Sequence, residues 1–410
     1  MFTLCRQLLA ILASIAALAA PLLAVRAASA QPVTLACLWD EDTLAYETKK
    51  FPGLADVITG RFERNPDEYY RLRLSRVTAQ IDKTPSELSL YDDAAVACDR
   101  LHNDADAITW MDRKRAAMSA LPAAAQDTPE TREHWYRYHA NLGTFYVHQW
   151  LRSGANHADI DALRRSDAEL VEALTLNPDA HFGRERYQLG AVRWLIALAT
   201  DPDHTDATLY DFIADGHAGD LWPGRPPRDG PSPKLDPADA VRGFSGLIVL
   251  GDAWQSVDVY WALRQALVAD GDQPTAYLAE LRANELLAAG RKSLAPTFLI
   301  SHTVGRGAAL EVSDANKLIA RDYFARARVA ADQWCVNRLT YMALPLASGD
   351  HPDTNPNFWQ DWTDNPPAPP VPDYSEKALS RAMLGAGVGL LVILSGIAVV
   401  VWIVVRNLRR

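Results

Sequence analysis

One short run of residues contains the side chains that acid–base catalysis uses. His181-Phe182-Gly183-Arg184-Glu185-Arg186 brings an imidazole, a carboxylate and two guanidinium groups within six positions. If the run is helical, His181 and Glu185 lie one turn apart and form an ordinary side-chain pair. The structural interpretation is the simpler one, so this run predicts no catalytic residue.

Other groups that could bind a metal or act as a nucleophile have the wrong spacing. His139 and His148 are nine residues apart, whereas two histidines that bind one metal from a single helix face are about four apart. Asp40, Glu41 and Asp42 are consecutive and lack the alternating ligands and the glycine of a calcium loop, which favours a solvated acidic turn. No serine lies in a nucleophile-elbow sequence. We therefore expect no metal, no cofactor and no enzymatic activity.

Three cysteines lie beyond residue 30: Cys37, Cys98 and Cys335, none of them in a Cys-x-x-Cys pair. Three cysteines allow one disulfide at most. The candidate is a bridge between Cys37 and Cys98, because it would tie the N-terminal segment to the first helical hairpin. The alternative is that Cys98 and Cys335 are small buried residues of helices.

The N-terminus predicts export. Arg6, the apolar stretch Leu8–Val25 and the small residues of Ala28-Ser29-Ala30 have the form of a cleaved signal peptide. The body behind it, Gln31–Ser375, is acidic, with 34 basic and 50 acidic residues and a net charge of −16. Nucleic acid binding needs a basic surface, and anionic lipids attract basic segments, so neither is an expected partner of this body.

The C-terminus predicts a membrane anchor. Ala382–Val405 is twenty-four residues without a charge, which at about 1.5 Å per residue spans a bilayer core of roughly 30 Å. The body is then extracytoplasmic, in the periplasm or at the cell surface, and the basic tail Arg406–Arg410 is cytoplasmic. Gly385 and Gly389 have the small-xxx-small spacing that allows two such helices to form a weak homodimer.

The body between these ends has the pattern of helices. Ala, Leu, Arg and Glu recur at helical spacing from Leu54 to Ala347, and no period-two strand pattern is present. The sequence thus predicts an all-α fold. Two stretches, Tyr91–Met111 and Glu133–Pro178, have the pattern of helical hairpins, in which Gly143 and Ala173 are small where two helices cross closely.

The second hairpin resembles the tetratricopeptide repeat (TPR). The resemblance rests on Leu142-Gly143-Thr144-Phe145-Tyr146, followed by Leu170, Ala173 and Pro178. In the first hairpin Ala95 is the equivalent of Gly143, and a third, weaker unit begins at Leu189-Gly190. The segments Cys37-Leu38-Trp39-Asp40, Asn177–Gln188 and His351-Pro352-Asp353-Thr354 are similar to bacterial TPR-containing proteins without an assigned activity.

The resemblance implies hairpins stacked into a superhelix that binds a protein or peptide in its concave groove. The first helix of each hairpin would line that groove. Six polar side chains are expected there, namely Asp92, Asp99, Arg137, Asn141, Thr144 and His148. They could hold an extended peptide through its backbone and charges; a solvated face without a ligand is the alternative.

The expected organisation is a signal peptide (1–30), a TPR-like helical region (31–200), a Pro- and Gly-rich loop (201–239), further helical hairpins (240–350), a Pro-rich stalk (351–377), a transmembrane helix (378–405) and a basic cytoplasmic tail (406–410). The expected function is that of a membrane-anchored extracytoplasmic scaffold for a protein or peptide. Two alternatives remain open: an envelope hydrolase with its site in Val241–Trp359, and a purely structural spacer.

Overall fold

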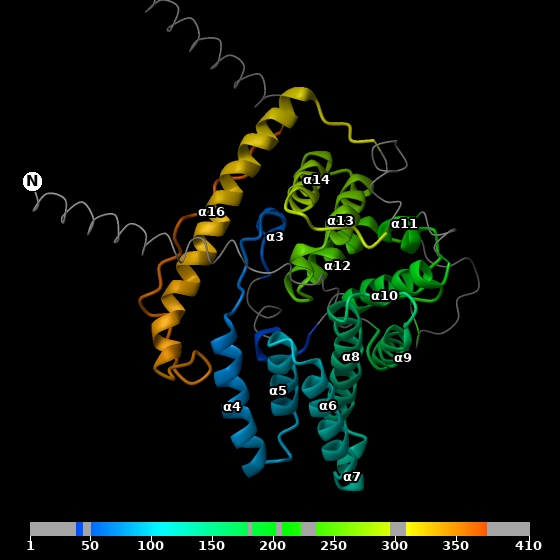
Figure 1. Cartoon of the computed structure of the whole chain (residues 1–410), viewed down its shortest axis with the longest axis vertical. Helices are drawn as coiled ribbons and strands as arrows, with labels where there is room; N and C mark the ends of the chain where they lie inside the picture. Colours follow the sequence, from blue (N-terminus) through cyan, green and yellow to red (C-terminus); the bar gives the residue numbers. More distant parts are fainter. Residues whose placement is uncertain are drawn as a thin grey trace, which may run out of the picture. The chain divides into compact units, whose positions relative to one another are not determined.

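The computed structural model describes residues 38–43, 51–178, 183–201, 207–221, 223, 235–295 and 309–374. Every regular element within these ranges is a helix (Figure 1), which confirms the all-α fold class for this part of the chain. The elements are α3 (Leu54–Thr59), α4 (Asp67–Lys83), α5 (Ser89–Arg100), α6 (Asp104–Ser119), α7 (Ala123–Gln126), α8 (Pro129–Arg152), α9 (Asp161–Leu176), α10 (Arg184–Thr200), α11 (Leu209–Ala214), α12 (Pro237–Val249), the 3-10 turn η2 (Ala253–Gln255), α13 (Val257–Asp270), α14 (Gln273–Ala288) and α16 (Asp314–Ala347).

Several helices begin at a residue whose side chain accepts a hydrogen bond from the first turn. This arrangement satisfies one of the backbone N–H groups that a helix start leaves without a partner. The capping residues are Thr128, Thr208, Asp236, Ser256, Asp272 and Ser313. Proline in the first turn of α8, α12 and α14 also favours a helix start there, because its fixed φ is close to the helical value.

The two expected hairpins are formed by α5 with α6 and by α8 with α9. The second pair packs tightly at Gly143, where a Cβ atom would lie 2.9 Å from the Cγ of Leu170. Gly190 on α10 approaches Ile213 on α11 in the same way, with a built Cβ 2.7 Å from its Cδ1. A third close helix pair therefore begins where the weaker third unit was expected.

The loop expected over residues 201–239 is in part helical. Leu209, Phe212 and Ile213 are buried on α11, which contacts both α10 and α13. The composition of that stretch predicts a loop because its many Pro, Gly and Asp residues outweigh one short apolar turn. Helix α12 also begins earlier than expected, at Pro237.

The later helices continue the packing. Contacts run from α12 to α13, from α13 to α14 and from α14 to α16. Helix α16 has 34 residues and also contacts α3 and α4. The last long helix of the described part thus touches one of its first helices.

The segment expected to form a stalk packs against the helices instead. Phe358 is buried together with Tyr69 of α4 and Met342 of α16, and the rings of Tyr341 and Trp359 stack with centroids 5.6 Å apart. Further along, the backbone oxygen of Pro366 accepts a hydrogen bond from Arg61 (2.8 Å). The stalk prediction is therefore wrong for residues 351–374, which run beside α16 (orange in Figure 1), because aromatic and polar contacts outweigh the stiffness of a Pro-rich run.

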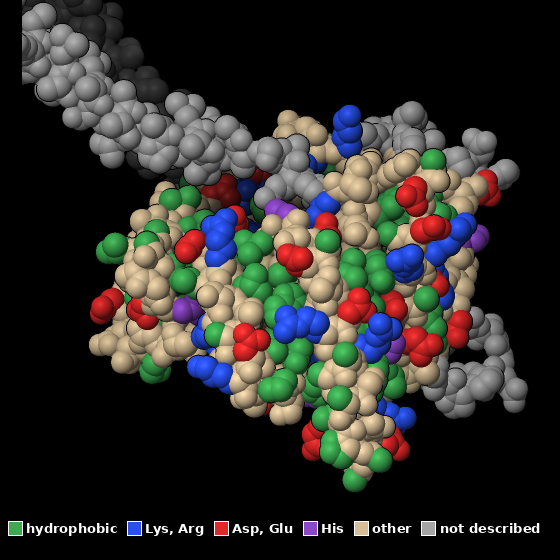
Figure 2. Space-filling view, turned by 60° about the horizontal axis from the view of Figure 1, so that its bottom comes forward, with side chains coloured by type: hydrophobic (Ala, Val, Ile, Leu, Met, Phe, Trp, Pro, Cys, Tyr) green, Lys and Arg blue, Asp and Glu red, His purple; other side chains and the backbone are tan. Residues whose placement is uncertain are grey.

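Several sequence predictions lie outside the described residues. These are the signal peptide, the stretch Ala382–Val405 with Gly385 and Gly389, and the residues Cys37 and His181. Within the described ranges, none of the helices is both long enough and apolar enough to cross a membrane. On the face of the molecule in Figure 2, basic and acidic side chains are intermixed and form no continuous basic surface.

Candidate functional site

A six-residue segment ahead of α3, Leu38–Thr43, lies against α4, α5 and α8, and we call it the strap. Leu38 is fully buried in the apolar cluster of those helices. Trp39 is 5% exposed and packs in a second cluster with Tyr136 and Ala140 of α8. Leu38 and Trp39 are therefore part of the core, although the strap belongs to no hairpin.

One side chain of α8 binds the strap through its backbone. Asn141 accepts a hydrogen bond from the N–H of Trp39 (2.7 Å) and donates one to the carbonyl oxygen of the same residue (3.0 Å). The amide of Asn141 also donates to a carboxylate oxygen of Asp92 on α5 (3.1 Å). A single amide thus bonds both backbone groups of Trp39.

The indole of Trp39 is held from three sides. Its Nε1 donates to the hydroxyl of Tyr136 (3.0 Å), which in turn donates to Glu185 of α10 (2.7 Å). The rings of Trp39 and Tyr136 meet edge to face, with centroids 5.5 Å apart, and the guanidinium of Arg137 lies 5.0 Å from the indole centroid. Burial raises the pKa of Glu185 above its usual value.

Two of the three acidic residues of the strap, Asp40 and Asp42, are ion-paired. Arg73 of α4 lies 3.4 Å from Asp40 and 2.9 Å from Asp42, and it also pairs with Asp353 at 2.7 Å. The expectation of a solvated acidic turn is therefore wrong for Asp40 and Asp42, whereas Glu41 is exposed. These ion pairs form because Arg73 is buried and its positive charge attracts carboxylates from two distant parts of the chain.

A second helix contacts the strap backbone through a carboxylate. The N–H of Glu41 donates to Asp93 of α5 (3.0 Å). Asp93 is 7% exposed, and burial together with the nearby charge of Asp40 raises its pKa to about 8. Burial and the charge of Asp42 likewise raise the pKa of Asp40 to about 6.

The six residues expected to line a groove converge, but most of their side chains are covered. Asp99, Asn141, Thr144 and His148 have no exposed surface, and Asp92 has almost none. The prediction of solvent-facing side chains is wrong for these five. Only Arg137 remains half-buried.

The covered residues bond to one another between successive helices. Asp99 of α5 pairs with His148 and Arg152 of α8 at 2.7 and 2.8 Å. Burial alone would raise the pKa of Asp99, but the charges of Arg152 and His148 hold it below its usual value. Thr144 accepts a hydrogen bond from Gln188 of α10 (2.9 Å).

Asp92 has a cation of its own. The ammonium group of Lys114 on α6 lies 2.6 Å from its carboxylate, and both side chains are buried. Asp92 also accepts the bond from Asn141, so the residue that grips the strap is positioned by an ion pair behind it. Removing either charge would leave the other buried and unpaired, which is strongly destabilising.

The remaining candidate residues have structural contacts. His139 lies 2.6 Å from Glu169, a contact between neighbouring helices α8 and α9. Cys98 is a free thiol, 2% exposed in the apolar cluster of α5 and α6. The prediction of a bridge from Cys98 to Cys37 is therefore wrong in this structure, and burial raises the pKa of the Cys98 thiol to about 12.

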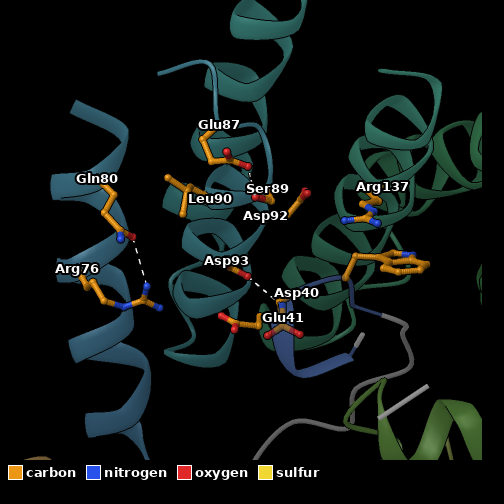
Figure 3. A pocket seen from close by; sticks show the side chains of 11 residues that line it. Asp40, Glu41, Arg76, Gln80, Glu87, Ser89, Leu90, Asp92, Asp93 and Arg137 are labelled. Carbon is orange, nitrogen blue, oxygen red and sulfur yellow. Dashed lines mark hydrogen bonds between the residues drawn. The ribbon is translucent and has the colours of Figure 1, made fainter. Parts of the chain in front are cut away.

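A cavity of about 350 Å³ lies beside the strap. Figure 3 shows Arg76 and Gln80 of α4 on one side, Arg137 of α8 on the other, and Asp92 and Asp93 of α5 between them. Asp40 and Glu41 of the strap complete the wall. The strap thus covers one part of the surface shared by α4, α5 and α8 and leaves the adjoining part open.

Sequence reasoning missed the residues that make this site. The sequence does not single out Arg73, Asp93, Lys114 or Tyr136, although the Asp92-Asp93 pair directly precedes the apolar run Ala94–Cys98 of α5. Two adjacent carboxylates in such a helix indicate buried partners. For Arg73 and Lys114 the sequence holds no comparable signal.

No protein-family model matches the chain, and neither the curated proteins nor the solved structures include a match.

Proposed function

We propose that this chain is an exported, membrane-anchored protein whose TPR-like hairpins bind an extended segment of another protein. The observation that carries the proposal is the pair of hydrogen bonds from Asn141 to the N–H and the C=O of Trp39. A side chain that bonds both backbone groups of one residue fixes the register of a bound peptide, and the pocket for the side chain of that residue gives specificity. The groups that hold the strap are the groups that a segment of another chain requires.

In this proposal the strap is the resident occupant of the groove and a partner segment takes its place. The strap offers an aromatic anchor, Trp39, and two backbone contacts, to Asn141 and Asp93. A buried aromatic residue in a pocket and a few backbone hydrogen bonds are the usual basis of affinity in peptide recognition. Export and anchoring rest on the two ends of the sequence, and the TPR-type superhelix rests on the repeat pattern.

The proposal is tested by turning the strap into a separate peptide. A protease site inserted between Thr43 and Phe51 of the full-length protein allows the strap to be cleaved from the body after folding. A fluorescent peptide with the sequence Leu38–Thr43 is then added in excess and its anisotropy measured. Exchange into the groove is expected, and it should be absent for a scrambled peptide and strongly reduced in Asn141→Ala.

Two results would count against peptide binding. If the cleaved protein takes up the scrambled peptide equally well, the groove does not recognise extended backbone and an anchor in register. If the cleaved strap never exchanges and the body stays folded, the strap is an inert part of the core. The latter result would favour the purely structural role that the sequence left open.

A further inference from the structure

Acidic side chains outnumber basic ones around the cavity beside the strap. Four carboxylates on or next to its walls face a cation: Asp40 faces Arg73, Asp92 faces Lys114, Asp353 faces Arg76, and Glu133 faces Arg137. Three lining carboxylates, Glu41, Glu87 and Asp93, have no ion pair with any described residue. The two arginines on the walls are thus already neutralised, and the excess charge of the cavity is negative.

Asp93 is the buried member of these three. One of its oxygens accepts the N–H of Glu41, and its other oxygen has no hydrogen-bond donor among the described residues. The residue is nevertheless only 7% exposed, and it lines the cavity (Figure 3). That second oxygen is open to the cavity, where it can accept a hydrogen bond from a cation or carry a proton.

The charges around Asp93 come from every element that packs on it. They are Asp40 and Glu41 of the strap, Arg73 and Arg76 of α4, Glu87 before α5, Asp92 of α5 with Lys114 of α6, and Arg137 of α8. Burial and Asp40 outweigh Arg73, so the pKa of Asp93 rises to about 8. At neutral pH the carboxyl therefore carries a proton unless a cation replaces it.

The strap is a poor occupant at this point. It places two acidic residues, Asp40 and Glu41, on a wall that already carries Glu87, Asp92 and Asp93. Like charges within a few ångströms repel, whereas a cation at the same place would gain a charge-assisted hydrogen bond. A segment with a basic residue at the position of Glu41 would therefore bind more tightly than the strap.

We propose that this cavity is the pocket for a lysine or arginine side chain of the segment that takes the strap's place, with Asp93 as its carboxylate partner. The inference rests on the proposed function only in so far as that side chain belongs to a partner protein. Binding of a small ammonium or guanidinium group to the cavity does not depend on it.

The first test uses small probes and the full-length protein in detergent micelles. Nα-acetyl-lysine methylamide and Nα-acetyl-arginine methylamide are titrated by calorimetry against the neutral Nα-acetyl-glutamine methylamide. Both basic probes should bind, and Asp93→Asn should weaken binding about tenfold or more, because it removes a charge-assisted contact. Asp112→Asn, an exposed carboxylate on α6, is the matched control and should leave binding unchanged.

Proton release gives a readout that a merely structural role of Asp93 would not move. At pH 7 a bound cation displaces the proton of Asp93, so the heat of binding should depend on the ionisation enthalpy of the buffer and affinity should rise from pH 6 to pH 9. Both effects should vanish in Asp93→Asn. Equal binding of the glutamine probe, or unchanged lysine binding in Asp93→Asn, would overturn the proposal.

The second test places the cation on the strap itself. Glu41→Lys in the full-length protein should slow hydrogen exchange of the strap about tenfold or more, and Asp93→Asn should remove the gain. Should Asp93→Asn fail to fold, Ser89→Arg replaces it: an arginine on the first turn of α5 fills the cavity with a tethered cation, and probe binding should be lost. Probe binding that survives Ser89→Arg would place the ligand elsewhere.

The outcomes separate this inference from the proposed function. If the basic probes bind at Asp93 but the cleaved strap does not exchange with peptide, the pocket is real and peptide binding is wrong. If the strap exchanges but a peptide with lysine at the position of Glu41 binds no better, the groove binds peptides and the basic pocket is wrong.

Discussion

Replacing Asn141 by alanine should release the strap from α8. The side chain makes two hydrogen bonds to the backbone of Trp39 and one to Asp92, and all of these groups are buried. A buried donor or acceptor that loses its partner costs about 1–3 kcal/mol, so the two backbone groups of Trp39 together cost about 2–6 kcal/mol. The strap can open locally and rehydrate, so this cost appears mainly as strap opening and less as global unfolding.

Hydrogen exchange with mass spectrometry measures that opening. A cost of about 3 kcal/mol corresponds to roughly a hundredfold loss of protection, at about 1.4 kcal/mol per factor of ten. We therefore expect peptides that contain Trp39 to exchange about a hundredfold faster in Asn141→Ala. Gln149→Ala is the control, because Gln149 is an amide on the same helix whose side chain has no hydrogen bond to the described residues. Equal exchange in both variants would refute the role given to Asn141.

Three further predictions test the helix crossing, the buried carboxylate and the buried thiol. Gly143→Ala places a Cβ 2.9 Å from Leu170 and should lower the free energy of unfolding by about 1–3 kcal/mol in urea titrations, whereas Gly53→Ala, with its nearest neighbour at 3.7 Å, should change it less; equal effects would contradict the close crossing. Asp93 has a pKa of about 8 when folded and an ordinary value of 3.8, so its proton is lost first in the unfolded chain and stability should fall as pH rises from about 4 to 8. Asp93→Asn should retain stability across that window in amine-free buffer, and parallel pH profiles of the two proteins would refute the assignment. Cys98, buried with a pKa of about 12, should resist maleimide in the folded protein and react after unfolding, as monitored by mass spectrometry; rapid labelling of the folded protein would contradict its burial.

Local patterns of side-chain size predicted the helices well. Only a small residue fits where Gly143 meets Leu170 and where Gly190 meets Ile213. The size of a side chain can be read directly from the sequence. Helical spacing of apolar residues and capping residues at helix starts are equally local. The all-α class and the crossing of α8 with α9 could therefore be predicted.

The site depends on partners far apart in the sequence and could not be predicted in the same way. Trp39 and Asn141 are 102 positions apart, and Arg73 and Asp353 are 280 apart. Six residues without periodicity give no sign of burial, so the acidic residues of the strap predict a solvated turn. The spacing of the polar residues on α5 and α8 predicts an exposed groove, but their exposure depends on what covers them, and most of them are buried.

The Pro-rich segment shows the same limit. A run such as Pro366–Pro372 predicts a stiff spacer from its composition alone, whereas Tyr341 and Trp359 decide where it lies. Helix α16 ends shortly before this segment. The aromatic contacts with α16 outweigh the preference of the proline run for an extended, free-standing conformation.

The most direct test of backbone recognition by Asn141 uses N-methylated peptides. With the strap cleaved from the body, two versions of the Leu38–Thr43 peptide are compared, one methylated on the backbone nitrogen of Trp39 and one on that of Asp40. Only the Trp39 N–H donates to Asn141, and the Asp40 N–H has no acceptor among the described residues. Methylation at Trp39 should therefore weaken binding about tenfold or more, with little effect at Asp40. Equal affinity of the two peptides would contradict recognition of the strap through its backbone.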